Sequence, residues 1–318
     1  MMSLIRNEWM KIFQKKSSYV FIGFLLLMVI GSAFIESKLN PVNKDADWKQ
    51  DVRADIKEQE KQMKSPEFND EDKEFFKEQM EVNEQLLKEN INPDLQTNWT
   101  YMAEWTTSIT SFITLFVVIV CSSLVSSEFS DGTIKQLLIR PYKRWKILLS
   151  KYITSLLFAA LLLVILLAFS YLIGLLFFGS GSYTDKIMDP TSFGFAPVLV
   201  GEYVVNMMVY WIPGFLVITA IAFMLSTLFK SQALAVGIAI FILFASSTLT
   251  AIIQSFIEKN EWLKFVLFPH LDLRGYISET VNMFDGASLG FSIGVLAVYY
   301  FLFLALTFFF FQKKDITN

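Results

Sequence analysis

The side chains that most often carry out catalysis are scarce in this sequence. Among 318 residues there is one cysteine, Cys121, and one histidine, His270. A single cysteine excludes an intramolecular disulfide and argues against a metal site built from thiolates. A single histidine leaves almost no material for a histidine-ligated metal or a Ser/His pair. We therefore expect no enzyme activity and no cofactor in this chain. His270 could act as a proton relay, but a lone histidine beside Pro269 favours a structural role.

Two short motifs resemble ligand sites without completing one. The acidic stretch "DADWKQD" at 45–51 lacks the central glycine of a calcium loop. The stretch "GSGS" at 179–182 is not followed by the lysine that a phosphate-binding loop requires. The first is better interpreted as a solvated surface, and neither predicts a bound metal or nucleotide.

The stretch "SSEFSDGTIKQLLIRPYKRWKILLSK" at 126–151 has clear signals for a short helix. Thr133 begins a capping box with the glutamine three residues later, so each side chain can satisfy a backbone donor at a helix start. Gly132 lets the chain turn without steric penalty. Pro141 ends the helix, because proline disfavours a helical backbone at the preceding residue. The pattern predicts a helix at 134–140, about 10 Å long.

This short helix would present an apolar face next to a basic, aromatic stretch. Ile134, Leu137 and Leu138 fall on one side of it. After the proline, Tyr142 and Trp145 lie among three cations, a composition that favours headgroup depth in an anionic membrane. A partner protein could grip the apolar face, or the helix could lie flat on lipid, and the residues alone leave both open.

Long charge-free windows identify the elements that must position this segment. Hydrophobic residues make up 54% of the chain and charged residues only 18%, which is unlike a soluble domain. A helix needs roughly 20 apolar residues to cross a membrane. Six windows of at least 19 uncharged residues occur, at 17–35, 105–127, 152–184, 203–229, 231–257 and 286–312. They predict an all-α polytopic membrane protein with six transmembrane helices, of which the first is not cleaved.

Basic residues in short loops predict the orientation of the spans. Twelve lysines and arginines fall on the side that holds both termini and the 128–146 loop, against four in the short loops opposite. We therefore expect a multi-pass protein of the plasma membrane with cytoplasmic N- and C-termini.

The regions outside the spans are expected to be helical as well. Residues 36–104 hold 18 acidic and 10 basic residues, and apolar residues at helical spacing predict an extracellular helical hairpin. This hairpin is either structural or a lid for a substrate or partner. Residues 1–16 predict an amphipathic helix at the cytoplasmic interface, acting as a membrane anchor or a partner contact.

Two further features interrupt the apolar pattern. Pro213 and Gly214 lie in the middle of the fourth window, where the missing donor of proline predicts a kink. This is either a hinge or a packing bend. In the segment 258–285, the stretch "EWLKFVLFPHLDLRGYI" is too short to span the membrane, and predicts a re-entrant or interfacial piece.

The loop after the second span resembles that of type-2 ATP-binding-cassette (ABC) transporter permeases. The likeness is greatest to the bacterial branch of bacitracin-resistance, lantibiotic-immunity and sodium-export permeases. It rests on Glu128, Gly132, Thr133, Leu137, Leu138, Pro141, Arg144 and Lys151, and on "LSTLFKSQALA" at 225–235. One departure is Tyr142 and Lys143 before Arg144, where the family more often has an apolar residue and then serine. The other is the long charged outer segment, which many relatives lack.

The resemblance implies an ABC exporter permease without an ATPase of its own. The 134–140 helix would be a coupling helix that docks on a separate ATPase subunit, with Glu128, Gly132, Thr133, Ile134, Leu137, Leu138, Pro141 and Arg144 as coupling residues. ATP and Mg would be bound by that subunit. A second permease copy, in a homodimer or a permease pair, and membrane lipid complete the expected partners, and no nucleic acid is expected. Cargo would be amphipathic, peptide or lipid-like, as in multidrug or peptide-antibiotic resistance.

The expected layout follows from these boundaries. It comprises a cytoplasmic amphipathic helix (1–16), TM1 (17–35), the extracellular helical segment (36–104), TM2 (105–127), the coupling-helix loop (128–146), TM3 (147–178), an extracellular loop (179–202), TM4 (203–229), TM5 (231–257), an extracellular or re-entrant loop (258–285), TM6 (286–312) and a cytoplasmic tail (313–318). A non-transporting receptor, sensor or scaffold that uses the hairpin is the alternative function. Import in place of export is compatible with the residues.

Overall fold

Six helices in the described part of the chain are long and apolar enough to cross a membrane. The computed structural model describes residues 1–40, 47–66, 68–134, 142–188, 196–257, 259–277 and 287–313. The six spans are α2 (Lys16–Leu39), the run Asn98–Ser130, α9 (Arg144–Phe178), α10 (Val200–Leu228), α11 (Gln232–Ile257) and α12 (Leu289–Lys313). The predicted number and helical class of the spans are confirmed.

A short amphipathic helix precedes the first span. This helix, α1 (Met2–Gln14), ends where Lys15 adopts an extended backbone, and α2 starts directly after it. The Ser18 hydroxyl donates to the Ile12 carbonyl oxygen at 2.6 Å and fixes the corner between the two helices. The buried residues of α1 are Leu4, Glu8 and Ile12, so one of its charged residues faces the protein.

The second span is built from four consecutive helical pieces. These are α5 (Asn98–Tyr101), the π-helical turn η1 (Met102–Thr106), α6 (Thr107–Ser123) and α7 (Ser126–Ser130). The run begins seven residues before the predicted start at 105. Glu104 falls inside it but is exposed, so a charge in the sequence does not mark the end of the helix.

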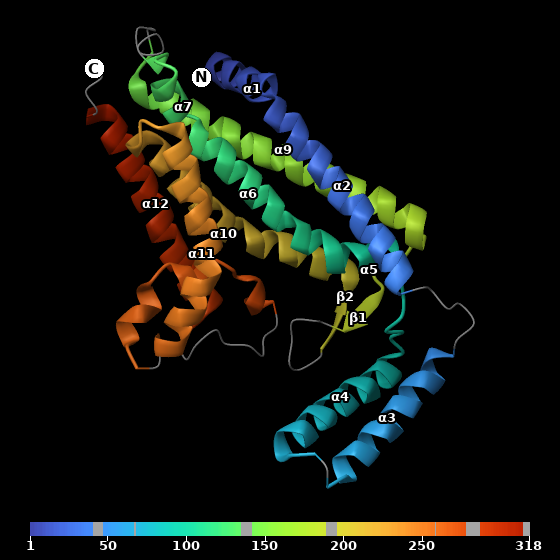
Figure 1. The fold of residues 1–318 in the computed structure, drawn as a ribbon. Helices are drawn as coiled ribbons and strands as arrows, with labels where there is room; N and C mark the ends of the chain where they lie inside the picture. Colours follow the sequence, from blue (N-terminus) through green and yellow to red (C-terminus); the bar gives the residue numbers. More distant parts are fainter. Residues whose placement is uncertain are drawn as a thin grey trace.

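Two helices between the first and second spans pack side by side (Figure 1). They are α3 (Trp48–Lys64) and α4 (Asp70–Glu89). A capping box formed by Asn69 and Asp72 starts α4, and Asn90 in a left-handed conformation ends it. An ion pair of 2.9 Å between Lys186 and Glu89 connects α4 to the loop after α9.

That loop contains the only two strands of the described residues, which the all-α prediction did not include. In β1 (Lys186–Met188) and β2 (Pro197–Leu199), Lys186 pairs with Leu199 in an antiparallel register. The described residues between α11 and α12 contain three short 3₁₀ turns, η2 (Glu261–Phe265), η3 (Phe268–His270) and η4 (Arg274–Tyr276).

The core lies between α6 and α10, which are mostly buried and contact each other. In contrast, few residues of α11 and α12 are fully buried. Pro213 lies inside α10, which continues past it. A Cβ added at Gly214 would clash with the Leu271 carbonyl oxygen, so close packing of the η3 segment explains this glycine. A hinge at this position stays a prediction.

The two ends of the bundle differ in what they carry (Figure 1). The N-terminus, the C-terminal end of α12 and α7 lie at one end, which we call the terminal end. The α3–α4 pair lies at the opposite end, beyond β1 and β2. Figure 1 thus places the N-terminus, the end of α12 and α7 on the same side of the spans.

Candidate functional site

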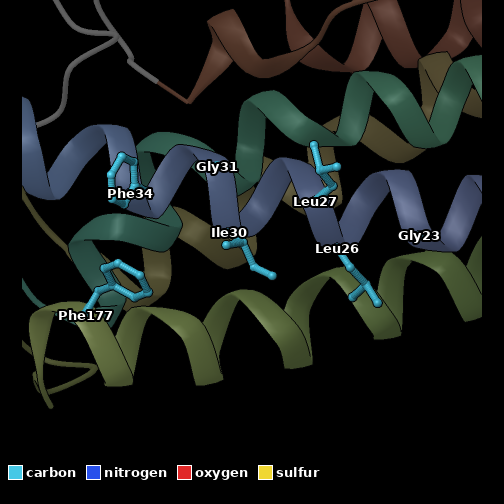
Figure 2. Close-up of a pocket in the computed structure, with 7 residues that line it drawn as sticks. All are labelled: Gly23, Leu26, Leu27, Ile30, Gly31, Phe34 and Phe177. Carbon is cyan, nitrogen blue, oxygen red and sulfur yellow. The ribbon is translucent and has the colours of Figure 1, made fainter.

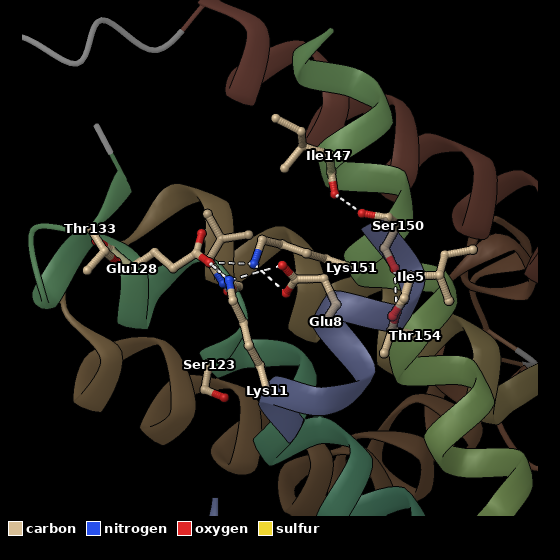
Figure 3. A network of polar contacts seen from close by, with 12 residues as sticks. Ile5, Glu8, Lys11, Ser123, Glu128, Thr133, Ile147, Ser150, Lys151 and Thr154 are labelled. Atoms are coloured by element: carbon tan, nitrogen blue, oxygen red, sulfur yellow. Dashed lines mark hydrogen bonds and ion pairs between the residues drawn. The ribbon is translucent and has the colours of Figure 1, made fainter. Parts of the chain in front are cut away.

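Four charged side chains form a buried cluster at the terminal end of the bundle (Figure 3). Lys151 on α9 places its Nζ 2.8 Å from Glu8 Oε2 and 2.7 Å from Glu128 Oε1. Lys11 places its Nζ 3.0 Å from the other Glu8 oxygen and 3.0 Å from the same Glu128 oxygen. We call these four residues the charge cluster. It joins three elements, α1, α7 and α9, with two positive and two negative charges.

Three of the four charged side chains are buried, so their stability depends on the ion pairs that they form with one another. Lys151 is 1% exposed, Glu8 5% and Glu128 8%, whereas the Lys11 side chain is 41% exposed. Charges removed from water are stable only when their partners compensate the lost hydration. Glu128 Oε2 is buried and has no hydrogen-bond partner among the described residues. Lys151 is therefore the member that the two carboxylates most depend on.

The two members of the charge cluster on α1, Glu8 and Lys11, have pKa values shifted by their partners. Burial acts to raise the pKa of Glu8, but the nearby charges and hydrogen bonds of Lys151 and Lys11 outweigh it and lower that pKa. Burial acts to lower the pKa of Lys11, but Glu128 and Glu8 raise it overall. Both residues are thus held in their charged forms.

A break in the second span turns Glu128 toward the cluster. Between α6 and α7 the regular helix is interrupted, and the Ser226 hydroxyl of α10 accepts from the backbone N–H groups of Val125 (2.8 Å) and Ser126 (3.1 Å). These bonds satisfy donors that the break leaves free. The new helix α7 then carries Glu128 to the interface with α1 and α9.

Further polar contacts tie the same end of the bundle together. The Ser130 hydroxyl donates to the Lys230 carbonyl oxygen at 3.0 Å and accepts from the Gln232 backbone at 3.1 Å. This connects α7 to the turn between α10 and α11. Arg144 donates from Nη1 to the Gln312 carbonyl oxygen at 3.2 Å, which links the start of α9 to the end of α12.

Seven of the eight predicted coupling residues fall into three groups. Glu128 belongs to the charge cluster, and Arg144 contacts α12. Gly132 has a φ of 70°, as a turn out of the span requires, and the Thr133 hydroxyl lies 3.5 Å from the Glu128 carbonyl oxygen. Leu137, Leu138 and Pro141 lie outside the described residues.

Ile134 differs from the expectation. It is 5% exposed and packs in the hydrophobic core, so the prediction that it forms part of a projecting apolar face is wrong. Burial removes its side chain from water and fixes the start of the 134–140 segment against the bundle.

The roles of Glu8 and Lys11 were missed from the sequence. Glu8 is four residues from both Leu4 and Ile12, which places it on the same helical face as those buried residues. This spacing was the available signal. The sequence places Leu4 and Ile12 on one apolar face with Ile5, Trp9 and Phe13, and a charged residue is not expected on such a face.

His270 is buried at the end of the bundle opposite the charge cluster. Its Nε2 lies 2.8 Å from the Lys264 carbonyl oxygen, and its Nδ1 lies 2.8 Å from the Ser292 hydroxyl. A carbonyl oxygen only accepts, so Nε2 carries the proton and Nδ1 accepts from Ser292. Tyr276 also contacts the Ser292 hydroxyl at 2.8 Å. These contacts hold the η2–η4 segment against α12 and support the structural interpretation.

An apolar groove of about 530 Å³ lies along α2, next to the end of α9 (Figure 2). Its lining consists of Gly23, Leu26, Leu27, Ile30, Gly31, Phe34 and Phe177. These side chains offer no ionisable or hydrogen-bonding group, so the charge cluster is the stronger candidate for function.

Comparison with known proteins relates this architecture to a family. A family model described as "Protein of unknown function (DUF2705)" matches residues 77–317. The "Uncharacterized protein YhcI" of Bacillus subtilis (strain 168) is 37% identical over 331 residues, which cover the whole of both chains. The "Uncharacterized membrane protein YdbK" of the same organism is 29% identical over 226 residues, covering 71% of this chain and 87% of the relative. With its six apolar helices, the chain is a membrane protein that belongs to the DUF2705 family.

Proposed function

We propose that this chain is the permease subunit of an ATP-driven exporter of the type-2 ABC class. A separate ATPase subunit would bind the 134–140 segment, supply the ATP and Mg site, and drive the spans. The observation that carries this proposal is the charge cluster, because it fixes the chain just before that segment to α1 and α9.

Both sides of the 134–140 segment are held by the bundle. Before it, Glu128 is bound by Lys151, and Ile134 is buried in the core. After it, Arg144 binds the end of α12. Because the segment is held at both ends, its displacement would move the spans it contacts, including α9 and α12. A flexible loop would not transmit that displacement. Such rigid connections are what a subunit without its own nucleotide site needs.

The proposed orientation places the terminal end in the cytoplasm and the α3–α4 pair outside the cell. Loop charge favours this arrangement, and α1 would then lie at the cytoplasmic interface of the plasma membrane. The exposed faces of α11 and α12 leave room for a second permease copy and for lipid. The cargo would be an amphipathic, peptide or lipid-like molecule moved outward.

A pair of substitutions in the 134–140 segment tests this function. Leu137→Asp places a charge on the predicted apolar face, whereas Gln136→Glu adds the same charge on the opposite side and keeps the capping-box pattern. We expect an ATPase to co-purify in mild detergent with the wild-type chain and the Gln136→Glu variant, but not with Leu137→Asp. Absence of an ATPase from repeated wild-type preparations would reject the proposal, as would its equal recovery with Leu137→Asp.

A receptor or scaffold function is the second candidate. The observation that favours it is the α3–α4 pair, which extends beyond the spans (Figure 1). Of its two helices, α4 carries eight acidic residues and three lysines. If the purified chain contains no ATPase but retains another protein, and deletion of 47–89 releases that protein, this second function replaces the first.

A further inference from the structure

The N-terminal helix is attached to the bundle by charge as well as by apolar packing. The ring of Phe13 lies edge-on to Phe158 of α9 with centroids 5.9 Å apart. One and a half turns earlier, Glu8 binds Lys151 of the same helix. A helix that served only as a membrane anchor would turn its apolar face to lipid and its charges to water. Here Glu8 is turned into the protein, at the cost of its hydration.

We infer that α1 is a moving part of the coupling device, and that Lys151 is the positioning residue that joins Glu8 of α1 to Glu128 of α7. This inference rests on the proposed function. Motion of the segment after α7 would be passed through Glu128 to Lys151, and from Lys151 to both α9 and α1. The helix α1 would thus respond to the ATPase subunit without having to touch it.

The geometry of the two carboxylates connects α7 to α1 through both lysines. Both lysines bind the same oxygen of Glu128, at 2.7 and 3.0 Å, while its Oε2 is buried and has no partner among the described residues. Glu8 differs, because each of its oxygens binds one lysine. A shift of α7 that keeps Glu128 paired must therefore move both lysines, and the lysines must move Glu8 with them.

A fluorophore on α1 tests this inference. Met10 is 46% exposed, whereas the single native cysteine, Cys121, is fully buried. A thiol-reactive dye would therefore label a Met10→Cys variant selectively. The labelled chain, co-purified with its ATPase and placed in vesicles of phosphatidylethanolamine and phosphatidylglycerol, is exposed to ATP and orthovanadate. We expect the dye emission to change when the ATPase is trapped.

Three further substitutions in the Met10→Cys background identify the cause of that change. Glu8→Gln keeps the shape of the side chain but removes its charge, and we expect it to abolish the emission change while the ATPase still co-purifies. Glu8→Asp retains the charge and should restore a response. Arg6→Met removes a charge from an exposed position of the same helix, outside the charge cluster, and should respond like the background. Recovery of a response in Glu8→Asp shows that the loss in Glu8→Gln does not come from misfolding.

The outcomes separate this inference from the proposed function. If the ATPase co-purifies but Glu8→Gln responds fully, or the background shows no change, the inference is overturned and the proposed function stands. If no ATPase co-purifies with any variant, the proposed function itself fails.

Discussion

At residue scale, Lys151 carries a positive charge that is only 1% exposed between two glutamates. Removing one partner of a buried ion pair is expected to cost about 3–5 kcal/mol, because it leaves uncompensated charge away from water. Lys151→Met should therefore destabilise the folded chain by that amount. Lys11→Met should cost about 1 kcal/mol or less, because its side chain is partly exposed. Thermal unfolding in detergent measures both, and equal losses would contradict the dominant role of Lys151.

His270 gives a second prediction at this scale, on the pH dependence of stability. Burial lowers the pKa of His270 below its ordinary value, against a smaller opposing effect of its bond to the Lys264 carbonyl. The unfolded chain then binds the proton more readily than the folded one, so this stabilisation is full above about pH 6.5 and is lost as the pH falls through and below that value. We expect the unfolding temperature of the wild type to fall more steeply between pH 8 and 5 than that of His270→Asn. Parallel slopes would show that His270 does not contribute.

The sequence predicted individual residues least well where a contact joins distant parts of the chain. Glu128 and Lys151 belong to the family pattern, but nothing in the sequence predicts that Glu8 also pairs with Lys151. Glu8 and Lys151 are 143 positions apart. Gly132 was predicted correctly, because a turn with positive φ is a local requirement of the backbone.

At element scale, the loop between α11 and α12 packs against α10 so closely at position 214 that only glycine fits there. Gly214→Ala would bring a Cβ against the Leu271 backbone oxygen, which cannot move aside as a flexible side chain could. Gly237 on α11 is the matched control, because an added Cβ there meets nothing within 4 Å. We expect Gly214→Ala to destabilise the chain by about 1–3 kcal/mol. Gly237→Ala should stabilise it by up to about 1 kcal/mol, since alanine favours the helix. A neutral Gly214→Ala would mean that this segment packs loosely.

Helices were easier to predict than their ends and breaks. An apolar run of about 20 residues has one low-energy form in a membrane, so composition was sufficient to find the six spans. The break between α6 and α7 depends on Ser226, about 100 positions further along, which supplies the missing hydrogen bonds. The strands β1 and β2 are three residues each, too short for an alternating pattern to be recognised.

At the scale of the whole molecule, the two ends of the bundle have different chemistry. One end gathers the N-terminus, the end of α12 and the charge cluster, and the other carries the α3–α4 pair with its acidic α4 (Figure 1). Charge in the short loops predicts that the terminal end is cytoplasmic. The family match starts at residue 77, within α4, so α1–α3 lie before the matched region while the charge cluster spans both parts.

Labelling one exposed residue at each end of the bundle tests the proposed orientation. Phe75 on α4 is 56% exposed, and Tyr142 at the terminal end is 41% exposed. Phe75→Cys and Tyr142→Cys can be labelled in cells with a membrane-impermeant thiol reagent, and the unsubstituted chain is the control because Cys121 is buried. We expect Phe75→Cys to react in intact cells and Tyr142→Cys only after permeabilisation. The reverse pattern would place the charge cluster outside the cell, where no ATPase could reach the 134–140 segment, and would exclude the proposed coupling whatever co-purifies with the chain.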